Sequence, residues 1–383
     1  MGCWVSVSGP GRERPCALRE NRIIIGPMTI RDHGFHPLRI ARIVPETADA
    51  ASLVLGVPSE LRDAFAYRAG QFCTFRASIG GETVLRCYSM SSSPDVDDEL
   101  AVTVKRVPDG LMSNWMLDEL QAGDVIDVTL PAGVFCLPDG GAEASGDLIA
   151  YCGGSGITPV FSLAKSALAT TDRQVRLLYA NRDRDSVIFG DALDELVAAH
   201  PDRIQVVRHH DADGGFLDEA TVAAFARGAG SVGDADHYIC GPGPFMDLVE
   251  VVLVSAGVTP DRVHIERFTP AELLDPADGA AADGGAASDG IRVTIELDGR
   301  VESTDHHPGT TLLQTARQVG LSAPSSCEAG SCATCMGRLV EGQVEMFVNN
   351  ALTDDEVADG WVLTCQSVPT SPTVHVVYGF EED

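Results

Sequence analysis

Lysine is almost absent from this chain: Lys105 and Lys165 are the only two among 27 basic residues, against 56 acidic ones. The net charge of −29 argues against nucleic-acid binding, because contacts to phosphate groups need clustered Lys and Arg. Long apolar runs are also missing, and none approaches the ~20 residues that cross a bilayer. The first residues are arginine-rich and lack the apolar block of a secretion signal. We therefore expect a cytoplasmic monomer that binds neither nucleic acid nor membrane.

At 383 residues the chain is long enough for two or three domains. Residues 1–34 are rich in Gly, Pro and Arg without any period, which predicts a flexible N-terminal extension. Short β-type runs separated by turn residues then predict a small antiparallel barrel over residues 35–140. These runs are 38–44, 51–55, 72–75, 100–104 and 125–128.

From 141 to 269 the pattern changes to strand, loop and helix, which predicts a parallel sheet covered by helices. The expected strands are 148–152, 175–180 and 237–240, with a helix at 160–168. Residues 270–290 have almost no bulky apolar side chains and predict a flexible linker. In the last segment, 291–383, a strand at 291–297, a turn at Asp298-Gly299 and a helix at 311–319 predict a small sheet with one packed helix.

Four cysteines in this last segment carry the most specific pattern of the chain. Three follow the spacing C-x4-C-x2-C, and 365−335−1 = 29 residues precede the fourth: Cys327, Cys332, Cys335 and Cys365. This spacing is typical of plant-type [2Fe-2S] ferredoxins. A structural zinc site is the alternative, although zinc sites usually pair thiols as two separate C-x2-C knuckles. The other seven cysteines show no pairing spacing, so we expect most of them to be reduced.

Two motifs in the barrel region indicate FAD when taken together. Arg86, Tyr88 and Ser89 follow a predicted strand and offer a pyrophosphate partner, a ring to stack on isoalloxazine and a hydroxyl for a ring nitrogen. Val104-Lys105-Arg106 precedes Gly110-x-x-Ser113, where we expect Ser113 to be the N-cap of a helix whose free amides bind phosphate. Each motif taken alone has a simpler explanation without a ligand. The first could be an arginine on an edge strand beside a half-buried tyrosine, and the second could be an ordinary capped helix.

Two glycine-rich loops follow two strands of the predicted parallel sheet. They contain Gly153, Gly154, Gly156 and Thr158 in the first loop, and Cys240, Gly241 and Pro242 in the second. Such a pair can clasp a dinucleotide, whereas a tight turn without ligand is the simpler alternative.

The expected strand at 175–180 is followed by Asn181-Arg182-Asp183, where an adenosine ribose could lie. Arg182 could pair with a 2′-phosphate and Asp183 would repel it, so we favour NADH over NADPH.

In combination these motifs resemble the ferredoxin-NADP reductase superfamily. More narrowly, residues 36–383 are similar to oxygenase reductases with a C-terminal plant-type ferredoxin domain, such as those of 3-ketosteroid 9α-hydroxylase and phenylacetyl-CoA epoxidase. The resemblance implies an antiparallel β-barrel FAD domain, an α/β parallel-sheet NAD(P)H domain and an α+β β-grasp ferredoxin domain. It implies that Arg86, Tyr88 and Ser89 bind FAD, with Val104, Lys105 and Ser113 near its phosphates.

By the same resemblance, Cys240 lies beside the nicotinamide, and Glu266 and Phe268 lie near the flavin ring. The implied catalytic set is therefore Ser89, Cys240, Glu266 and Phe268; a free Cys and a packed Phe are the structural alternatives. One residue departs from the family pattern, because Ala333 stands where the family usually has Gly.

NAD(P)H releases two electrons as hydride and a [2Fe-2S] cluster accepts one at a time, so a flavin must stand between them. We therefore expect the reductase component of a multicomponent oxygenase, whose terminal oxygenase is a Rieske-type steroid hydroxylase. A di-iron epoxidase or a cytochrome P450 is the alternative acceptor. A redox sensor without turnover, or a flavin-only NADH oxidase with zinc in the cysteine loop, would lack this activity, and an absorbance spectrum separates these hypotheses.

Overall fold

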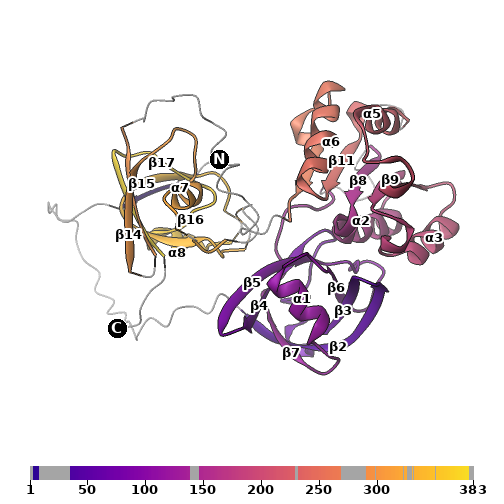
Figure 1. The fold of residues 1–383 in the computed structure, drawn as a ribbon, viewed down its shortest axis with the longest axis horizontal. Helices are drawn as coiled ribbons and strands as arrows, with labels where there is room; N and C mark the ends of the chain where they lie inside the picture. The colour runs from indigo at the N-terminus through magenta and orange to yellow at the C-terminus, as the bar shows by residue number, and fades with distance from the viewer. Residues whose placement is uncertain are drawn as a thin grey trace, which may run out of the picture. The chain divides into compact units, whose positions relative to one another are not determined.

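The computed structural model describes residues 3–7, 35–138, 146–228, 232–268, 290–297, 299–321, 323–325, 330, 332–349 and 351–378. The chain forms two compact units (Figure 1): residues 36–270, called the larger unit, and residues 271–383 with 1–35, called the C-terminal unit. The predicted linker and most of the predicted N-terminal extension lie outside the described residues. The finer domain boundaries given above stay predictions.

The first half of the larger unit is a six-stranded antiparallel barrel, as predicted. Its strands pair in the order β5-β4-β7-β2-β3-β6, and a bridge between Met90 and Val102 joins the two outer strands. Helix α1 packs on the barrel with Met112 and Met116 buried. The elements are β2 (His36–Thr47), β3 (Ala50–Gly56), β4 (Phe72–Ile79), β5 (Glu82–Ser89), β6 (Leu100–Lys105), α1 (Leu111–Asp118) and β7 (Val125–Val128).

The second half is a five-stranded parallel sheet in the order β10-β9-β8-β11-β12. Alternate residues of the central strand enter two cores: Ala150 packs with α2 and α3, and Tyr151 packs with α5 and α6. Both faces are therefore covered, which explains the continuous apolar run in β8. The elements are β8 (Leu148–Gly153), α2 (Ile157–Thr170), β9 (Val175–Asn181), α3 (Gly190–Ala199), β10 (Ile204–His210), α4 (Asp211–Gly214), α5 (Glu219–Arg227), β11 (Asp236–Cys240), α6 (Gly243–Ser255) and β12 (Val263–Glu266).

The predicted strands of this sheet are confirmed, while β10 and β12 were not foreseen. Helix α2 begins at Ile157, three residues before the predicted start, because Pro159 is tolerated in a first helical turn. The chain moves to one side of β8 to form β9 and to the other side to form β11. Ligands of open α/β sheets bind at such a switch point, beyond the carboxyl ends of the strands.

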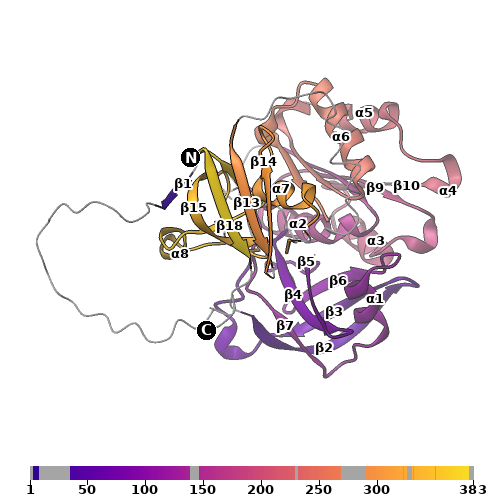
Figure 2. The same cartoon turned by 60° about the vertical axis from the view of Figure 1, so that its left-hand side comes forward.

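The C-terminal unit contains a mixed sheet on which α7 packs (Figure 2). The helix expected at 311–319 is present as α7, and a capping box between Thr311 and Gln314 closes its N-terminus. Strand β13 pairs parallel with β18 and antiparallel with β14. The elements are β13 (Arg292–Leu297), β14 (Arg300–Asp305), α7 (Leu312–Gln318), β15 (Met336–Met346), α8 (Asp354–Ala358), β16 (Trp361–Leu363), β17 (Ser367–Pro369) and β18 (Thr373–Tyr378).

One strand comes from the N-terminal segment. Residues Cys3–Val7 form β1, which pairs antiparallel with β15 over Gly342 to Met346, a pairing that composition did not indicate.

Two further expectations concern the chain as a whole. None of the helices in the described ranges has the length and apolar character of a membrane-crossing helix. The eight cysteines with described side chains form no disulfide with one another.

A buried ion-pair network lies at the edge of the parallel sheet opposite the glycine loops. Asp236 accepts hydrogen bonds from Arg173 (Oδ2–Nη1 2.7 Å) and Arg262 (Oδ1–Nη1 3.1 Å), and the side chains of Asp236 and Arg173 are 5% and 4% exposed. Burial by itself would raise the pKa of Asp236. The nearby His264 ring and the two guanidinium groups outweigh that effect and lower the pKa to about 2.

Asp236→Ala should destabilise the larger unit by about 3–5 kcal/mol, because it leaves the Arg173 charge buried without its partner. Urea unfolding followed by tryptophan fluorescence measures this, with Glu99→Ala, which removes the exposed Arg42 ion pair, as a nearly silent control. The pKa of Asp236 in the folded protein lies below the ordinary value of 3.8. Its contribution to the free energy of unfolding is therefore present above about pH 4 and is lost as the pH falls toward 2. Equal midpoints for the two variants would contradict this account.

Candidate functional site

The two predicted glycine loops touch at the carboxyl edge of the parallel sheet. A Cβ added to Gly156 would lie 2.0 Å from the Cys240 carbonyl oxygen, and one added to Gly153 would lie 2.8 Å from Pro242 Cδ. Gly241 is similarly close, since its Cβ would lie 3.0 Å from the Gly153 nitrogen. Only glycine fits at these points, so the close approach of the two loops explains their composition.

Side chains within the sheet hold the first loop in shape. The Tyr179 hydroxyl donates to the Gly154 carbonyl (3.3 Å) and accepts from the Ile188 amide (3.1 Å). The Thr158 hydroxyl is buried and donates to the Ser155 carbonyl at 3.0 Å. Gly154 itself has a φ of +53°, which glycine adopts at little cost. Thr158 therefore serves the loop conformation.

Three of the four residues expected to be catalytic come together from different elements. Ser89 ends β5 in the barrel, and its hydroxyl donates to Glu266 Oε2 at 2.9 Å. Glu266 ends β12 and is the register partner of Cys240, which ends β11. Burial, with the charge of Glu266, raises the pKa of the Cys240 thiol, so the thiol is protonated at neutral pH. Phe268, two residues further on, packs against the core beneath α2.

The other barrel residues of the predicted flavin motif lie on the same strand, β5. The Tyr88 ring meets Phe75 edge-on, with centroids 5.4 Å apart, and burial raises the pKa of its hydroxyl. The Arg86 guanidinium is half-buried and donates to the Leu85 carbonyl at 2.8 Å.

Ser113 is not the N-cap of α1, contrary to the prediction. The cap is Gly110, the helix begins at Leu111, and Ser113 lies in the first turn. The Ser113 hydroxyl instead accepts a hydrogen bond from the Val107 amide at 3.2 Å. A Cβ at Gly110 would lie 2.7 Å from this hydroxyl, so glycine is needed beside it. Ser113 thus shapes the loop that precedes the helix.

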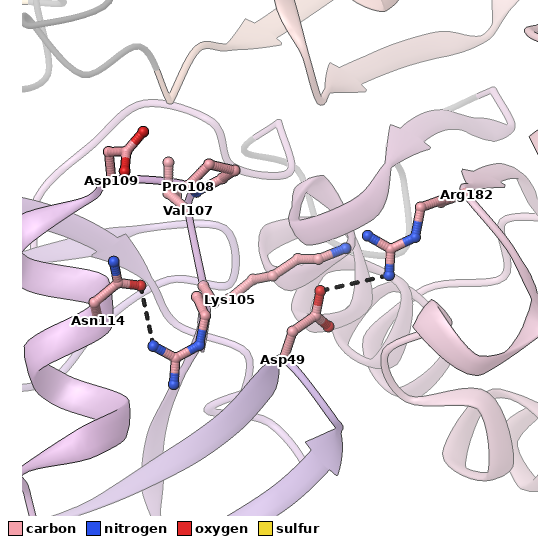
Figure 3. Close-up of a pocket in the computed structure, with 8 residues that line it drawn as sticks. Asp49, Lys105, Val107, Pro108, Asp109, Asn114 and Arg182 are labelled. Atoms are coloured by element: carbon pink, nitrogen blue, oxygen red, sulfur yellow. Dashed lines mark hydrogen bonds and ion pairs between the residues drawn. The ribbon is translucent and has the colours of Figure 1, made fainter.

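A groove of about 480 Å³ lies between the barrel and the parallel sheet (Figure 3). In Figure 3 the side chains of Lys105, Asp49 and Arg182 point toward one another across it. The lining residues are Asp49, Lys105, Arg106, Val107, Pro108, Asp109, Asn114 and Arg182.

The three cations of the groove differ in their partners. Arg106 binds Asp118 at 2.6 Å, and Arg182 lies 3.1 Å from Asp183 and 3.8 Å from Asp49. Within the described part of the chain, the Lys105 side chain has no hydrogen bond or ion pair, and its Nζ lies 3.5 Å from where a Gly154 Cβ would be. The groove therefore presents one available positive charge beside a glycine loop, which suits a phosphate group.

Asp49 was not identified from the sequence. It lies in the turn between β2 and β3, and neither strand carries a motif that points to Arg182. Only the docking of barrel on sheet brings the two together.

Cys332, Cys335 and Cys365 are described, and Cys327 lies outside the described residues. Hydrogen bonding with Cys365, with burial, raises the pKa of the Cys335 thiol, so these two sulfurs are neighbours. Cys332 donates to Thr334 Oγ1 at 3.2 Å. Gly330 has φ +72°, and a Cβ there would lie 2.6 Å from the Val348 carbonyl oxygen. Gathered thiols and a close-packed small-residue loop fit an iron–sulfur cluster.

Ala333 adopts a left-handed backbone conformation within this loop, with φ +55°. Its Cβ is disfavoured there, since the left-handed region costs an L-residue about 1 kcal/mol. The resemblance led us to expect glycine at this position, and the positive φ explains why alanine strains the loop.

Ala333→Gly should stabilise the C-terminal unit by about 1 kcal/mol, because glycine adopts this φ without strain. Thermal loss of the visible cluster absorbance measures the change. Ala316→Gly, the same substitution within helix α7, is the matched control and should be destabilising. A lower midpoint for Ala333→Gly would contradict the strain.

Three family profiles match successive parts of the chain. They are an oxidoreductase FAD-binding domain at residues 37–136, an oxidoreductase NAD-binding domain at 151–250 and a 2Fe-2S iron-sulfur cluster binding domain at 295–370. The first two cover the barrel and the parallel sheet, and the third covers the cysteine loop.

Known proteins also match along most of the chain. The ferredoxin reductase component of 3-ketosteroid-9-alpha-monooxygenase from Mycobacterium tuberculosis is 41% identical over 361 residues, 92% of this chain and 98% of that protein. A 1,2-phenylacetyl-CoA epoxidase subunit from Escherichia coli is 33% identical over 89% of this chain and 97% of that protein. Phthalate dioxygenase reductase shares the fold, with a TM-score of 0.54 and 24% identity over 91% of this chain and 99% of that one.

Proposed function

Since the chain belongs to the family of FAD- and [2Fe-2S]-containing reductase components of multicomponent oxygenases, we propose that it supplies electrons from NADH to a terminal oxygenase. The chain is an NAD(P)H-dependent oxidoreductase with FAD and a [2Fe-2S] cluster as its cofactors. When bound, FAD accepts an electron pair and releases single electrons, and the cluster carries these one at a time.

The observation that carries the proposal is the meeting of Ser89, Glu266 and Cys240 at the switch point of the sheet. Ser89 comes from the barrel and the other two from the parallel sheet, so their contact holds a flavin site against a nicotinamide site. The neutral, buried Cys240 offers the nicotinamide a surface without a competing nucleophile. The Ser89 hydroxyl donates its hydrogen to Glu266 Oε2 at 2.9 Å. A relay to a flavin nitrogen would need a protonated Glu266, which would give its proton to Ser89 while Ser89 gives its own proton onward.

Phosphate groups would be held by Lys105 and by the glycine loops. Lys105 supplies the charge beside Gly154, and a pyrophosphate could approach the backbone at Gly153, Gly154 and Gly156, which carry no Cβ. Arg86, Tyr88 and the loop shaped by Ser113 complete the proposed flavin side.

The proposed terminal oxygenase is a Rieske-type steroid hydroxylase, supported by the 41% identity to a 3-ketosteroid-9-alpha-monooxygenase component. A di-iron epoxidase is the second candidate, favoured by the 33% identity to an epoxidase subunit. The proposal includes a monomer in the cytoplasm, where NADH is produced, and size-exclusion chromatography with light scattering tests the first of these.

Cys332→Ala should abolish NADH-driven delivery of electrons to an oxygenase while NADH-driven ferricyanide reduction persists, because small dyes take electrons at the flavin. The visible bands of the cluster should disappear and the flavin bands should remain. The matched control is Cys136→Ala, a buried barrel-side cysteine outside the loop, which should keep both activities. If dye reduction were lost together with delivery while flavin stayed bound, the separate roles would be wrong.

The coenzyme preference follows from the charges around Arg182. Its guanidinium lies near carboxylates from two elements, Asp183 after β9 and Asp49 from the barrel. The hydrogen bond from Arg182 lowers the pKa of Asp183, so this carboxylate is ionised at neutral pH. A 2′-phosphate entering here would meet two negative charges and an arginine that is already paired. The arrangement favours NADH.

Asp49→Asn combined with Asp183→Asn should raise the NADPH to NADH ratio of kcat/KM by about tenfold, because Arg182 becomes available to a 2′-phosphate. Steady-state ferricyanide reduction with each coenzyme measures the ratio. Adding Arg182→Ala to the double variant should return the ratio to its original value. An unchanged ratio in the double variant would place the ribose elsewhere.

A further inference from the structure

An exposed aromatic residue lies beside the cysteine loop of the C-terminal unit. Phe347 is 55% exposed and Val348 is 37% exposed, directly after β15 ends at Met346. The Phe347 amide donates to the Gln366 carbonyl at 3.0 Å, next in sequence to Cys365. The Val348 carbonyl is the atom that a Cβ on Gly330 would meet at 2.6 Å. We call Phe347 and Val348 the apolar tip.

The tip is held by local hydrogen bonds rather than by burial. Asn349 Oδ1 accepts from the Leu352 amide at 2.8 Å and from the Ala351 amide at 3.3 Å. Asn349 Nδ2 donates to the Leu352 carbonyl at 2.9 Å. These bonds hold the chain that follows the tip, and the Phe347 amide bond to Gln366 holds the backbone of the tip itself. Preorganised side chains lose less entropy when a partner covers them.

The sequence around the tip is uniformly acidic. Residues 340–378 contain six Asp or Glu and no Lys or Arg: Glu341, Glu345, Asp354, Asp355, Glu356 and Asp359. An apolar centre with a charged rim is the usual composition of a protein interface. The complementary surface has an apolar pocket and Arg or Lys around it.

We propose that the apolar tip is the central contact through which the C-terminal unit docks a basic surface of its terminal oxygenase. Electrons leave the chain at the cysteine loop, and the tip is bonded to the residue after Cys365, so a partner seated on Phe347 comes close to the cluster ligands. The apolar contact supplies affinity, and the acidic residues of segment 340–378 supply orientation and encounter rate. This inference rests on the proposed function.

The test compares Phe347→Ala with Val301→Ala in the full-length holoprotein. Val301 is also 55% exposed, but it lies on β14, separated from β15 by β18 and β13. The probe is the purified oxygenase component of a 3-ketosteroid-9-alpha-monooxygenase, with its Kd measured by calorimetry. Anaerobic stopped-flow absorbance separately follows reduction of the chain's own cluster by NADH.

Phe347→Ala should weaken oxygenase binding by about tenfold or more, and Val301→Ala should change the Kd less than about twofold. Phe347→Leu should recover part of the loss. Both alanine variants should keep the cluster spectrum and the rate of internal cluster reduction.

Equal Kd values for Phe347→Ala and wild type would overturn the inference. Slower internal cluster reduction in Phe347→Ala, with unchanged oxygenase binding, would also overturn it, because the tip would then serve the chain's own flavin. If wild-type protein neither bound nor reduced the oxygenase, the proposed function would fail first, and this inference with it.

Discussion

The contact between Gly156 and the Cys240 carbonyl sets the geometry on which the candidate site depends. Any side chain at Gly156 would overlap that oxygen, so the loops after β8 and β11 stay together only while this position is glycine. Strand β11 also pairs with β12, and this pairing places Glu266 beside Cys240. Ser89 can then reach Glu266 from the barrel, and the two halves of the larger unit share one site.

Charge pairing decides what this site can accept. In a chain with a net charge of −29, both arginines that line the groove, Arg106 and Arg182, are engaged by carboxylates. Lys105, one of two lysines, is the groove cation without such a partner among the described residues. A single available positive charge beside a glycine loop suits one phosphate that is also held by backbone amides. Because Arg182 is already paired, the site disfavours the additional 2′-phosphate of NADPH.

In the C-terminal unit, the cysteine loop depends on backbone conformation more than on charge. Gly330 and Ala333 both have positive φ, and the loop packs against the Val348 carbonyl. Ala333 occupies a conformation that glycine would adopt more easily, so the loop is held by its surroundings. The same packing places Phe347 and Val348 on the surface next to Cys365.

The sequence by itself determined the three architectures and the chemistry of the cysteine and glycine loops. Their signals are local: alternation in β2 and β13, a continuous apolar run in β8, and ligand spacings that other sites rarely share. It could not show that Ser113 supports the preceding loop, since Gly110 is the N-cap and the Ser113 hydroxyl accepts from the Val107 amide. Asp49 beside Arg182, Ser89 on Glu266 and Phe347 near Cys365 join segments distant in sequence. Only tertiary packing decided these, because no periodicity or spacing in one segment reports which residue of another it will meet.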